Sequence, residues 1–379
     1  MSERFYLDYN ATAPLRPEVR EAMIGALALT GNPSSVHAQG RAARAAVDNA
    51  REQVAALVSA QPEDVIFTSG GTEANALALH VRSGNDWHYF VSAIEHPSVL
   101  ANLPAGSTQI PVSSDGIADF DWLAATVEET GAKGCRSFVF LMLANNETGA
   151  IQPVRRAAEI VHAAGGLIHT DAVQAPGRIA LNINELDVDL LTLSAHKIGG
   201  PKGVGALILK PGTAIEPLLK GWGQEGRRRA GTENVAGIVG FGVAAEIVRE
   251  YARNAQDLDE LRGKLEEGAR ALVPDAVIVS SAVPRLPNTS CIAVAGAKAE
   301  TLVIGLDLAG IAVSAGSACS SGKVEASHVL TAMRVDPEIA AGAIRISLGF
   351  STRNTDIQVF LKAWSELVAR LTHSRKVAA

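Results

Sequence analysis

Residues 65–79 read VIFTSGGTEANALAL, and this stretch indicates how the chain folds. Residues 65–69 are an apolar run of strand length, two glycines follow, and residues 72–81 have a helical pattern. Backbone N–H groups at the start of such a helix are unpaired and carry the positive end of the helix dipole, which suits phosphate binding. Taken alone, the stretch fits an ordinary strand–turn–helix with Thr72 as N-cap equally well.

The same alternation of apolar strands and alanine-rich helices continues through the first half of the chain. Strands are predicted at 65–69, 88–93, 137–143, 167–171, 190–195 and 204–209, and helices at 17–29, 37–58, 72–81 and 154–164. Strands that are apolar throughout and separated by helices form a mainly parallel sheet covered on both faces. The sequence therefore predicts an α/β fold whose ligands gather at the carboxyl ends of its strands.

The pattern changes in the second half. Residues 234–272 are prone to form helix, and after Pro274 the predicted strands and helices become shorter. We place a domain change near residue 253. A length of 379 residues agrees with two domains, because one domain typically takes about 150 residues.

Composition excludes several classes of protein. The formal charge of −6 argues against a nucleic-acid or anionic-lipid partner, and the longest apolar stretch, residues 235–245, is shorter than the roughly 20 residues that span a membrane. The short arginine run 227–229 favours a solvated loop or a subunit contact. Cys135, Cys291 and Cys319 lack the spacing of a zinc site or disulfide framework. With no secretory signal at the start, we expect a soluble cytoplasmic protein with no intrinsic metal.

Two further stretches carry residues suited to chemistry. In LSAHKIGGPKGVG, residues 193–205, Lys197 follows a strand end beside His196, where burial would lower the pKa of its amine and suit a Schiff base with an aldehyde. In HTDAVQA, residues 169–175, Asp171 ends a strand and can keep a pyridine nitrogen protonated. A surface lysine in a turn and an N-capping aspartate are the alternatives for the two segments.

A phosphate cradle, a lysine amine and a strand-end carboxylate are together the contacts that pyridoxal 5′-phosphate needs. At this point the chain resembles the cysteine desulfurases, specifically the group I, NifS/IscS-like branch. The resemblance runs in order from LDYNATAP (7–14) to RISLGFST (345–352), through TSGGTEAN (68–75), EHPSV (95–99), NNETG (145–149), TDAVQ (170–174), SAHKIGGPKGVG (194–205), AGTENV (230–235), LPNTS (286–290) and SAGSACSSG (314–322).

The resemblance implies a fold-type I, aspartate-aminotransferase-like transferase that forms a homodimer with its active sites at the subunit interface. The large domain, residues 15–253, is expected to hold the cofactor on a mainly parallel seven-stranded sheet. Residues 1–14 and 254–379 are expected to form a smaller α+β domain that carries the catalytic cysteine loop, at about 314–326.

The resemblance also assigns roles to residues that match the family's motifs. Lys197 would form the Schiff base with pyridoxal phosphate, and His96 would stack on its ring and take part in proton transfer. Asp171 would pair with the ring nitrogen, and Gln174 with the phenolic oxygen. The phosphate would be held by Gly71, Thr72, Ser194, His196 and, from the partner chain, Thr232. Asn146 would lie beside cofactor and substrate, and Arg345 would bind the substrate carboxylate through its fork of donors.

Cys319 decides which reaction the fold would catalyse. Its neighbours in SAGSACSSG are small and polar, so we expect a mobile loop that can reach a buried substrate and then an outside acceptor. The thiolate would be the nucleophile, which makes activity dependent on pH. Cys135 and Cys291, at and within predicted strands, are instead interpreted as inert buried residues.

The expected reaction converts L-cysteine to L-alanine and leaves a persulfide on Cys319. An iron–sulfur scaffold or another sulfur acceptor would take the sulfur, with Cys319 meeting an iron–sulfur cluster only transiently on that partner. Three alternatives stay open: a selenocysteine lyase or another lyase or aminotransferase of this fold, a nucleotide-dependent oxidoreductase using GFGVAA (240–245), and a non-catalytic sulfur carrier. The residues do not identify the pathway that receives the sulfur.

Overall fold

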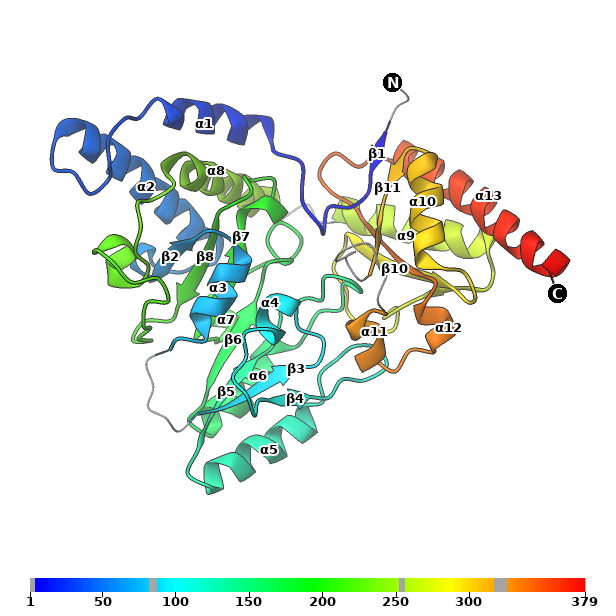
Figure 1. The fold of residues 1–379 in the computed structure, drawn as a ribbon, viewed down its shortest axis with the longest axis horizontal. Coiled ribbons are helices and arrows are strands. Elements are labelled where there is room, and N and C mark those ends of the chain that lie inside the picture. Colours follow the sequence, from blue (N-terminus) through cyan, green and yellow to red (C-terminus); the bar gives the residue numbers. More distant parts are fainter. Residues whose placement is uncertain (1–3, 82–86, 252–255, 317–325, 379) are drawn as a thin grey trace.

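A computed structural model describes residues 4–81, 87–251, 256–316 and 326–378. The chain forms two lobes joined along one side (Figure 1). The predicted boundary at residue 253 lies outside the described residues. On either side of it, the helix-prone stretch forms two helices, α8 (Val235–Tyr251) and α9 (Gln256–Leu272).

The larger lobe contains a seven-stranded sheet in the order β2-β8-β7-β6-β5-β3-β4. Every neighbouring pair is parallel except the two that involve β8. The strands are β2 (Val65–Thr68), β3 (Trp87–Ser92), β4 (Thr108–Ile110), β5 (Arg136–Phe140), β6 (Leu167–Asp171), β7 (Leu190–Ser194) and β8 (Gly205–Leu209). The predicted α/β fold with a mainly parallel sheet is confirmed. Only β4 was not foreseen, because three residues show no periodicity.

Helices cover both faces of this sheet, as its apolar strands require. On one face, side chains such as Phe67 and Leu191 pack against Phe241 of α8 in a large core, and on the other face Ile66 and Phe140 pack against Leu77. The helices of the first face are α1 (Pro17–Leu27), α2 (Ala38–Leu57), α5 (Phe120–Ala132), α6 (Val154–Ala163) and α8; α3 (Gly71–Ala78) and α4 (Pro97–Leu100) cover the second. The connections between these elements contain four short helices: η1 (Pro62–Asp64), α7 (Ile183–Leu186), η2 (Ala195–Lys197) and η3 (Gln224–Arg227).

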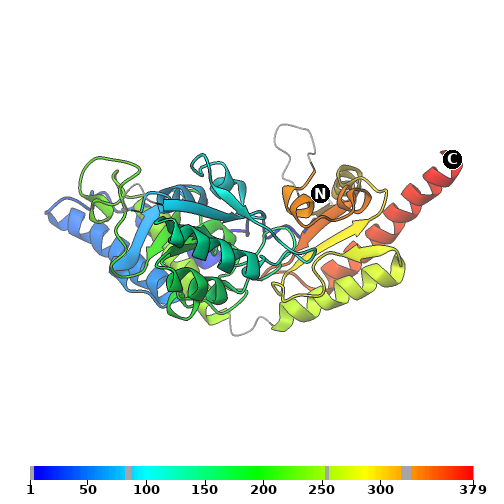
Figure 2. The same ribbon diagram turned by 90° about the horizontal axis from the view of Figure 1, so that it is seen from below.

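The smaller lobe has its own core around the fully buried Trp364. Its antiparallel sheet has the order β12-β13-β10-β9, and β1 pairs with β11 beside it. Figure 2 shows α9 and α13 along one side of this sheet. The elements are β1 (Phe5–Tyr6), β9 (Ala276–Ile278), β10 (Thr289–Val294), β11 (Ile311–Ala312), β12 (Ser314–Ala315), β13 (Ala343–Ser347), α10 (Ala299–Leu308), α11 (His328–Ala332), α12 (Pro337–Ala340) and α13 (Asn354–Ala378).

The N-terminal segment links the two lobes. Leu7 is buried in the core of the small lobe, whereas the backbone N–H of Ala13 donates to the carbonyl of His196 in the large one. Residues 8–13 therefore cross between the lobes next to Lys197. Within the part of the chain that the structure describes, no helix is long and apolar enough to span a membrane.

Two interpretations from the sequence require correction. Cys135 is exposed rather than buried, because it lies in the turn before β5 and not in the strand itself. Thr72 is not the N-cap of α3: Gly70 occupies that position, and Thr72 lies within the first turn.

The GFGVAA stretch lies inside α8, where Gly242 lets Ala50 of α2 approach closely, so it forms no nucleotide loop.

Candidate active site

Nine of the predicted site residues line one cavity of about 190 Å³. It lies where β6 and β7 end and α3 begins, as expected for an α/β sheet. The predicted residues that line it are Gly71, Thr72, His96, Asn146, Asp171, Gln174, Ser194, His196 and Lys197, joined by Asn75, Ser98, Met142, Ala144 and Val173.

One end of the cavity is suited to an anion. The first N–H groups of α3 have no partner within the helix, and a Cβ on Gly71 would lie 3.1 Å from the Val173 Cγ2 atom, so a side chain there would crowd Val173. The His196 Nδ1 atom lies 3.2 Å from the Thr12 hydroxyl. Burial, assisted by Lys197 and Lys202, lowers the pKa of His196 to about 4, so this ring is neutral and can donate one hydrogen bond without adding charge.

In the same cavity, Asp171 is held in place by two donors. The Asn75 side-chain amide donates to its Oδ2 atom at 2.7 Å, and the backbone N–H of Val173 donates to Oδ1 at 3.0 Å. Glu95 is fully buried close by, and burial, with a contribution from Asp171, raises the pKa of Glu95 well above its usual range. Glu95 is therefore uncharged, and Asp171 supplies the negative charge of the site.

A chain of hydrogen bonds connects Asp171 to His96. Besides Asp171, the Asn75 amide donates to the Ser98 Oγ atom at 2.9 Å, and Ser98 Oγ lies 2.8 Å from His96 Nδ1. The Ser98 hydroxyl therefore donates to Nδ1, which also accepts from the Ser98 backbone N–H. Desolvation by the surrounding protein, with Lys197 and His328 adding to it, lowers the pKa of His96. The neutral ring thus carries its proton on Nε2.

Lys197 is the reactive amine of the cavity. It lies in η2 just after β7, and its Nζ atom donates to the carbonyls of Asn10 and, at 3.1 Å, Ala11. Burial lowers the pKa of Lys197 to about 7, and the positive charges of Arg345 and Arg178 contribute. The amine can therefore lose its proton near neutral pH. Because Lys197 lies in η2 and lines the cavity, the alternative of a surface lysine in a turn is wrong.

Three predicted residues do not line this cavity. Arg345 is buried in β13, where it donates to the Asn146 carbonyl at 3.0 Å and to Asp8 at 2.8 Å. Thr232 is exposed on the surface of the chain. Cys319 and most of the predicted loop lie outside the described residues. The flanking strand β12 pairs with β13, with Ser314 opposite Arg345, so the segment that contains Cys319 follows a strand next to Arg345.

The sequence did not single out four residues that surround the site. Asn10 provides the carbonyl that accepts from Lys197 and, at 3.1 Å, from Gln174. Arg178 donates to Gln174, Asn75 supports Asp171, and Asp8 pairs with Arg345. Asn10 and Asp8 lie in LDYNATAP and Asn75 in TSGGTEAN, so the motifs contained three of them, although their contacts depend on the fold. Among the described residues, no cluster of three His, Cys, Asp or Glu side chains could hold a metal.

Comparison with known proteins gives concordant matches over almost the whole chain. A profile of the family described as aminotransferase class-V matches residues 5–360. A cysteine desulfurase of Cereibacter sphaeroides is 44% identical over 381 residues, which cover 97% of this chain and 97% of that protein. The cysteine desulfurase IscS of Dictyoglomus turgidum is 41% identical over 98% of this chain and 96% of its own length.

Solved structures agree with these matches. A NifS-like protein from Rickettsia africae superposes with a TM-score of 0.89 at 36% identity, covering 97% of this chain and all of that one. A structure of SspA in complex with cysteine superposes with a TM-score of 0.77 at 27% identity over 91% of this chain and 99% of that one.

Proposed function

The chain belongs to the aminotransferase class-V family, and on that premise we infer that it is a cysteine desulfurase, which converts L-cysteine to L-alanine and takes up the sulfur. One arrangement carries this inference: the amine of Lys197, with its pKa lowered to about 7, lines the same cavity as the Asp171 carboxylate. A neutral amine and a fixed carboxylate are the two groups that a pyridine aldehyde requires.

We propose that the cavity binds pyridoxal 5′-phosphate. The side-chain-free Gly71, the first turn of α3 and the neutral His196 provide an anion site for the phosphate. Asp171, held by Asn75, would keep the ring nitrogen protonated, and Gln174 would donate to the phenolic oxygen. When bound, the cofactor would supply an electron sink for negative charge at the substrate's Cα atom.

The protein's own side chains would move the protons. Lys197, once its amine is free, is the base that takes the proton from Cα and later returns it, because its pKa of about 7 suits both directions near neutral pH. His96 would present its Nε2–H to the substrate, with its orientation fixed by Ser98. Arg345 would bind the substrate carboxylate after exchanging Asp8 for it, and Asn146, whose carbonyl accepts from Arg345, would contact the substrate from the wall of the first cavity.

Cys319 is proposed as the sulfur acceptor. Its thiolate would attack the substrate's sulfur, so that an S–S bond forms as the C–S bond of cysteine breaks. The carbon gains hydrogen as the sulfur is oxidised to the persulfide level, and L-cysteine plus one protein thiol gives L-alanine plus one persulfide without an external oxidant. Both other cysteines are unsuited to this role. Burial raises the pKa of Cys291 to about 12, and Cys135 precedes the start of β5, at the edge of the parallel strands opposite the one where the cavity lies.

The proposed assembly is a homodimer. Thr232 of the partner subunit would complete the phosphate site, which agrees with the exposure of Thr232 in a single chain. Large apolar side chains near it, Leu219 and Trp222, are also exposed, the latter by 88%, as expected of a surface that a second copy covers. The persulfide would then pass to an iron–sulfur scaffold or another sulfur acceptor.

Product analysis tests this function. The protein is loaded with pyridoxal phosphate and given L-cysteine and a thiol reductant, and alanine and sulfide are measured. We expect equal amounts of the two products from the wild type and neither from Lys197→Ala. Pyruvate and ammonia in place of alanine would identify a different lyase and contradict the proposal.

A further inference from the structure

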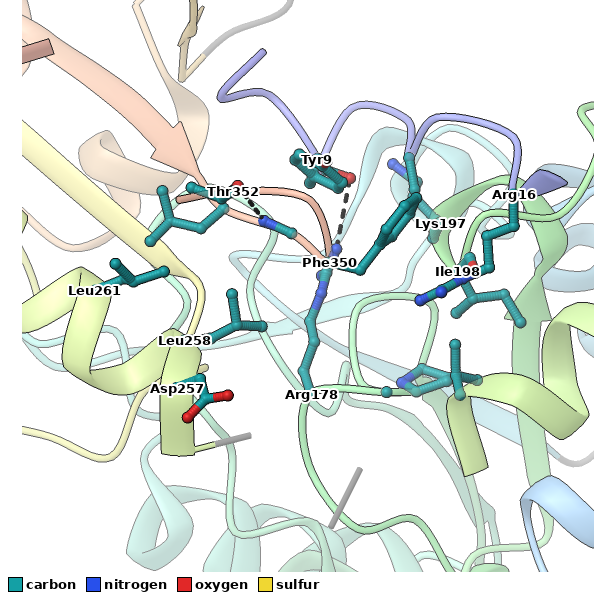
Figure 3. A pocket seen from close by; sticks show the side chains of 16 residues that line it. Tyr9, Arg16, Arg178, Lys197, Ile198, Asp257, Leu258, Leu261, Phe350 and Thr352 are labelled. Carbon is teal, nitrogen blue, oxygen red and sulfur yellow. Dashed lines mark hydrogen bonds between the residues drawn. The ribbon is translucent and has the colours of Figure 1, made fainter. Parts of the chain in front are cut away.

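Arg178 lies behind the proposed cofactor site, at the boundary with a second cavity. This cavity, of about 220 Å³, lies between the two lobes, and both Lys197 and Arg178 contribute to its walls. Figure 3 shows Tyr9, Phe350, Arg178 and Lys197 gathered around it, with Leu258 and Leu261 of α9 facing them. Lys197 also lines the first cavity, so it borders both the proposed cofactor site and the cavity that Arg178 lines.

The guanidinium of Arg178 is buried, with 6% of the residue exposed, and donates only to uncharged oxygens. Its Nη1 atom donates to the Gln174 carbonyl at 2.9 Å and also to the Gln174 side-chain oxygen, while Nη2 donates weakly to the Tyr9 carbonyl at 3.5 Å. Among the described residues, no carboxylate forms an ion pair with it. A buried cation without a counter-ion is costly, so its retention needs a reason.

The contact with Gln174 fixes which end of the amide faces the cofactor site. A guanidinium has donors and no acceptor, so the Gln174 Oε1 atom must point toward Arg178. The amide nitrogen then points away from Arg178 and donates to the Asn10 carbonyl at 3.1 Å. Gln174 also lines the first cavity, so this orientation offers an N–H donor there. With the amide reversed, an acceptor would face the phenolic oxygen and repel it.

The charge of Arg178 also acts on the lysine amine. After burial itself, the positive charges of Arg345 and then Arg178 disfavour the ammonium form of Lys197, and Asp171 and Asp8 oppose them. Other titratable side chains line a cavity together with Lys197: His96 and His196 in the first, and Tyr9, Arg16 and Asp257 in the second. Asp171 and Asp8 are each bound to a donor of their own, Asn75 and Arg345, so Arg178 is the unpaired charge of this group.

We propose that Arg178 is a positioning residue that sets the Gln174 amide with its donor toward the cofactor and keeps the Lys197 amine uncharged. This inference rests on the proposed function for the identity of the cofactor, but its effect on Lys197 is independent of any reaction. It explains why a buried arginine without an acidic partner lies next to a lysine whose reactivity requires loss of a proton.

The test measures the reactivity of Lys197 in the cofactor-free protein. Acetylation of Lys197 is followed by peptide mass spectrometry as a function of pH, which needs neither cofactor nor turnover. We expect Arg178→Met to raise the midpoint of the reaction by about one pH unit. In Arg178→Lys, which keeps the charge, the midpoint should stay within a few tenths of a pH unit of the wild-type value. Arg16→Met removes an arginine from the same cavity without touching Gln174 and should leave the midpoint unchanged.

A second measurement reports the orientation of the Gln174 side-chain amide. In protein loaded with pyridoxal phosphate, Arg178→Met should displace the visible absorbance maximum and its pH midpoint, because the Gln174 amide is then no longer held with its N–H donor toward the phenolic oxygen. Turnover number should fall with little change in KM for cysteine. A Lys197 midpoint in Arg178→Met equal to that of the wild type, in a variant that keeps its circular dichroism spectrum, would overturn the proposal. Failure of the proposed function would appear instead as absent alanine production by a wild-type protein whose Lys197 midpoint still depends on Arg178.

Discussion

Buried Arg345 forms an ion pair with the partly buried Asp8, in which the arginine Nη2 atom lies 2.8 Å from the Asp8 Oδ1 atom. The Ser314 hydroxyl donates to the second carboxylate oxygen at 2.9 Å. Arg345, the residue expected to bind a substrate carboxylate, is thus held by a carboxylate of its own chain until a ligand arrives. The remaining Nε atom of Arg345 is buried and has no partner among the described residues.

Asp8→Asn should destabilise the protein strongly. Removal of the carboxylate leaves the Arg345 guanidinium, of which only 7% of the side chain is exposed, as an uncompensated buried charge, which typically costs about 3 kcal/mol or more. Urea unfolding gives the loss, and L-alanine should recover part of it, since its carboxylate can replace that of Asp8. As a matched control, Asp307→Asn breaks the exposed pair with Arg4 and should cost less than about 1 kcal/mol. Equal losses of unfolding free energy in the two variants would show that the Asp8–Arg345 pair stabilises the protein no more than an exposed ion pair does.

Glu147→Gln should change how stability depends on pH. Burial raises the pKa of Glu147 to about 7 from 4.5, although the Ser327 hydroxyl and Arg345 oppose the shift. The folded state therefore holds the proton more tightly than the unfolded one. The resulting stabilisation is complete below pH 4.5 and is lost as pH rises through about 7.

Glutamine keeps the acceptor for Ser327 but cannot ionise. Relative to wild type, Glu147→Gln should therefore gain stability between pH 5 and pH 8, by about 3 kcal/mol at most. Unfolding in urea at the two pH values measures this difference. A constant difference between variant and wild type across that range would show that Glu147 has an ordinary pKa.

Uptake of pyridoxal phosphate by the cofactor-free protein should depend on the Lys197 proton. Only the neutral amine attacks the aldehyde, so the uptake rate should rise about tenfold per pH unit below pH 7 and level off above it. The growth of visible absorbance near about 420 nm reports the reaction. Lys197→Ala should show no such absorbance. A rate in the wild type that still rises steeply at pH 9 would contradict a pKa of about 7 for Lys197.

Ser98→Ala should impair proton transfer without preventing cofactor binding. It removes the hydroxyl between Asn75 and His96, so His96 Nδ1 keeps only the backbone N–H of residue 98 as a donor and loses its link to Asn75. The turnover number should fall about tenfold, the value of one hydrogen bond of about 1.4 kcal/mol, with the visible absorbance unchanged. Ser107→Ala, which removes an exposed hydroxyl bonded to Pro104, is the control and should keep full turnover. A turnover number in Ser98→Ala equal to that of the control would show that the Ser98 hydroxyl does not contribute to proton transfer.

The sequence predicted the large lobe well because its signals are local. The strands at 65–69 and 190–195 are apolar on both faces, which already requires helices on both sides. Asp171 ends one strand, and Lys197 follows the parallel strand beside it. Adjacent parallel strands end at the same edge, so these two residues had to meet.

What the sequence did not predict depends on contacts between distant segments. Asp8 and Arg345 are 337 positions apart and meet only because the N-terminal segment packs against β13. The proposed effect of Arg178 on Lys197 depends on the two lining one cavity from different connections between strands, which no periodicity encodes. Cys135 was misassigned because it immediately precedes β5, whose residues after Arg136 are all buried, and the sequence does not show at which residue the strand begins.

The most direct test of the central claim is the fate of sulfur in a single turnover. Wild-type protein loaded with pyridoxal phosphate is mixed with less than one equivalent of L-cysteine, without reductant. Alanine is then counted while mass spectrometry locates added sulfur. We predict one alanine for each sulfur atom gained on Cys319, and in Cys319→Ala no alanine although the visible absorbance is retained. Alanine formation by Cys319→Ala at the wild-type rate would contradict sulfur transfer through this cysteine.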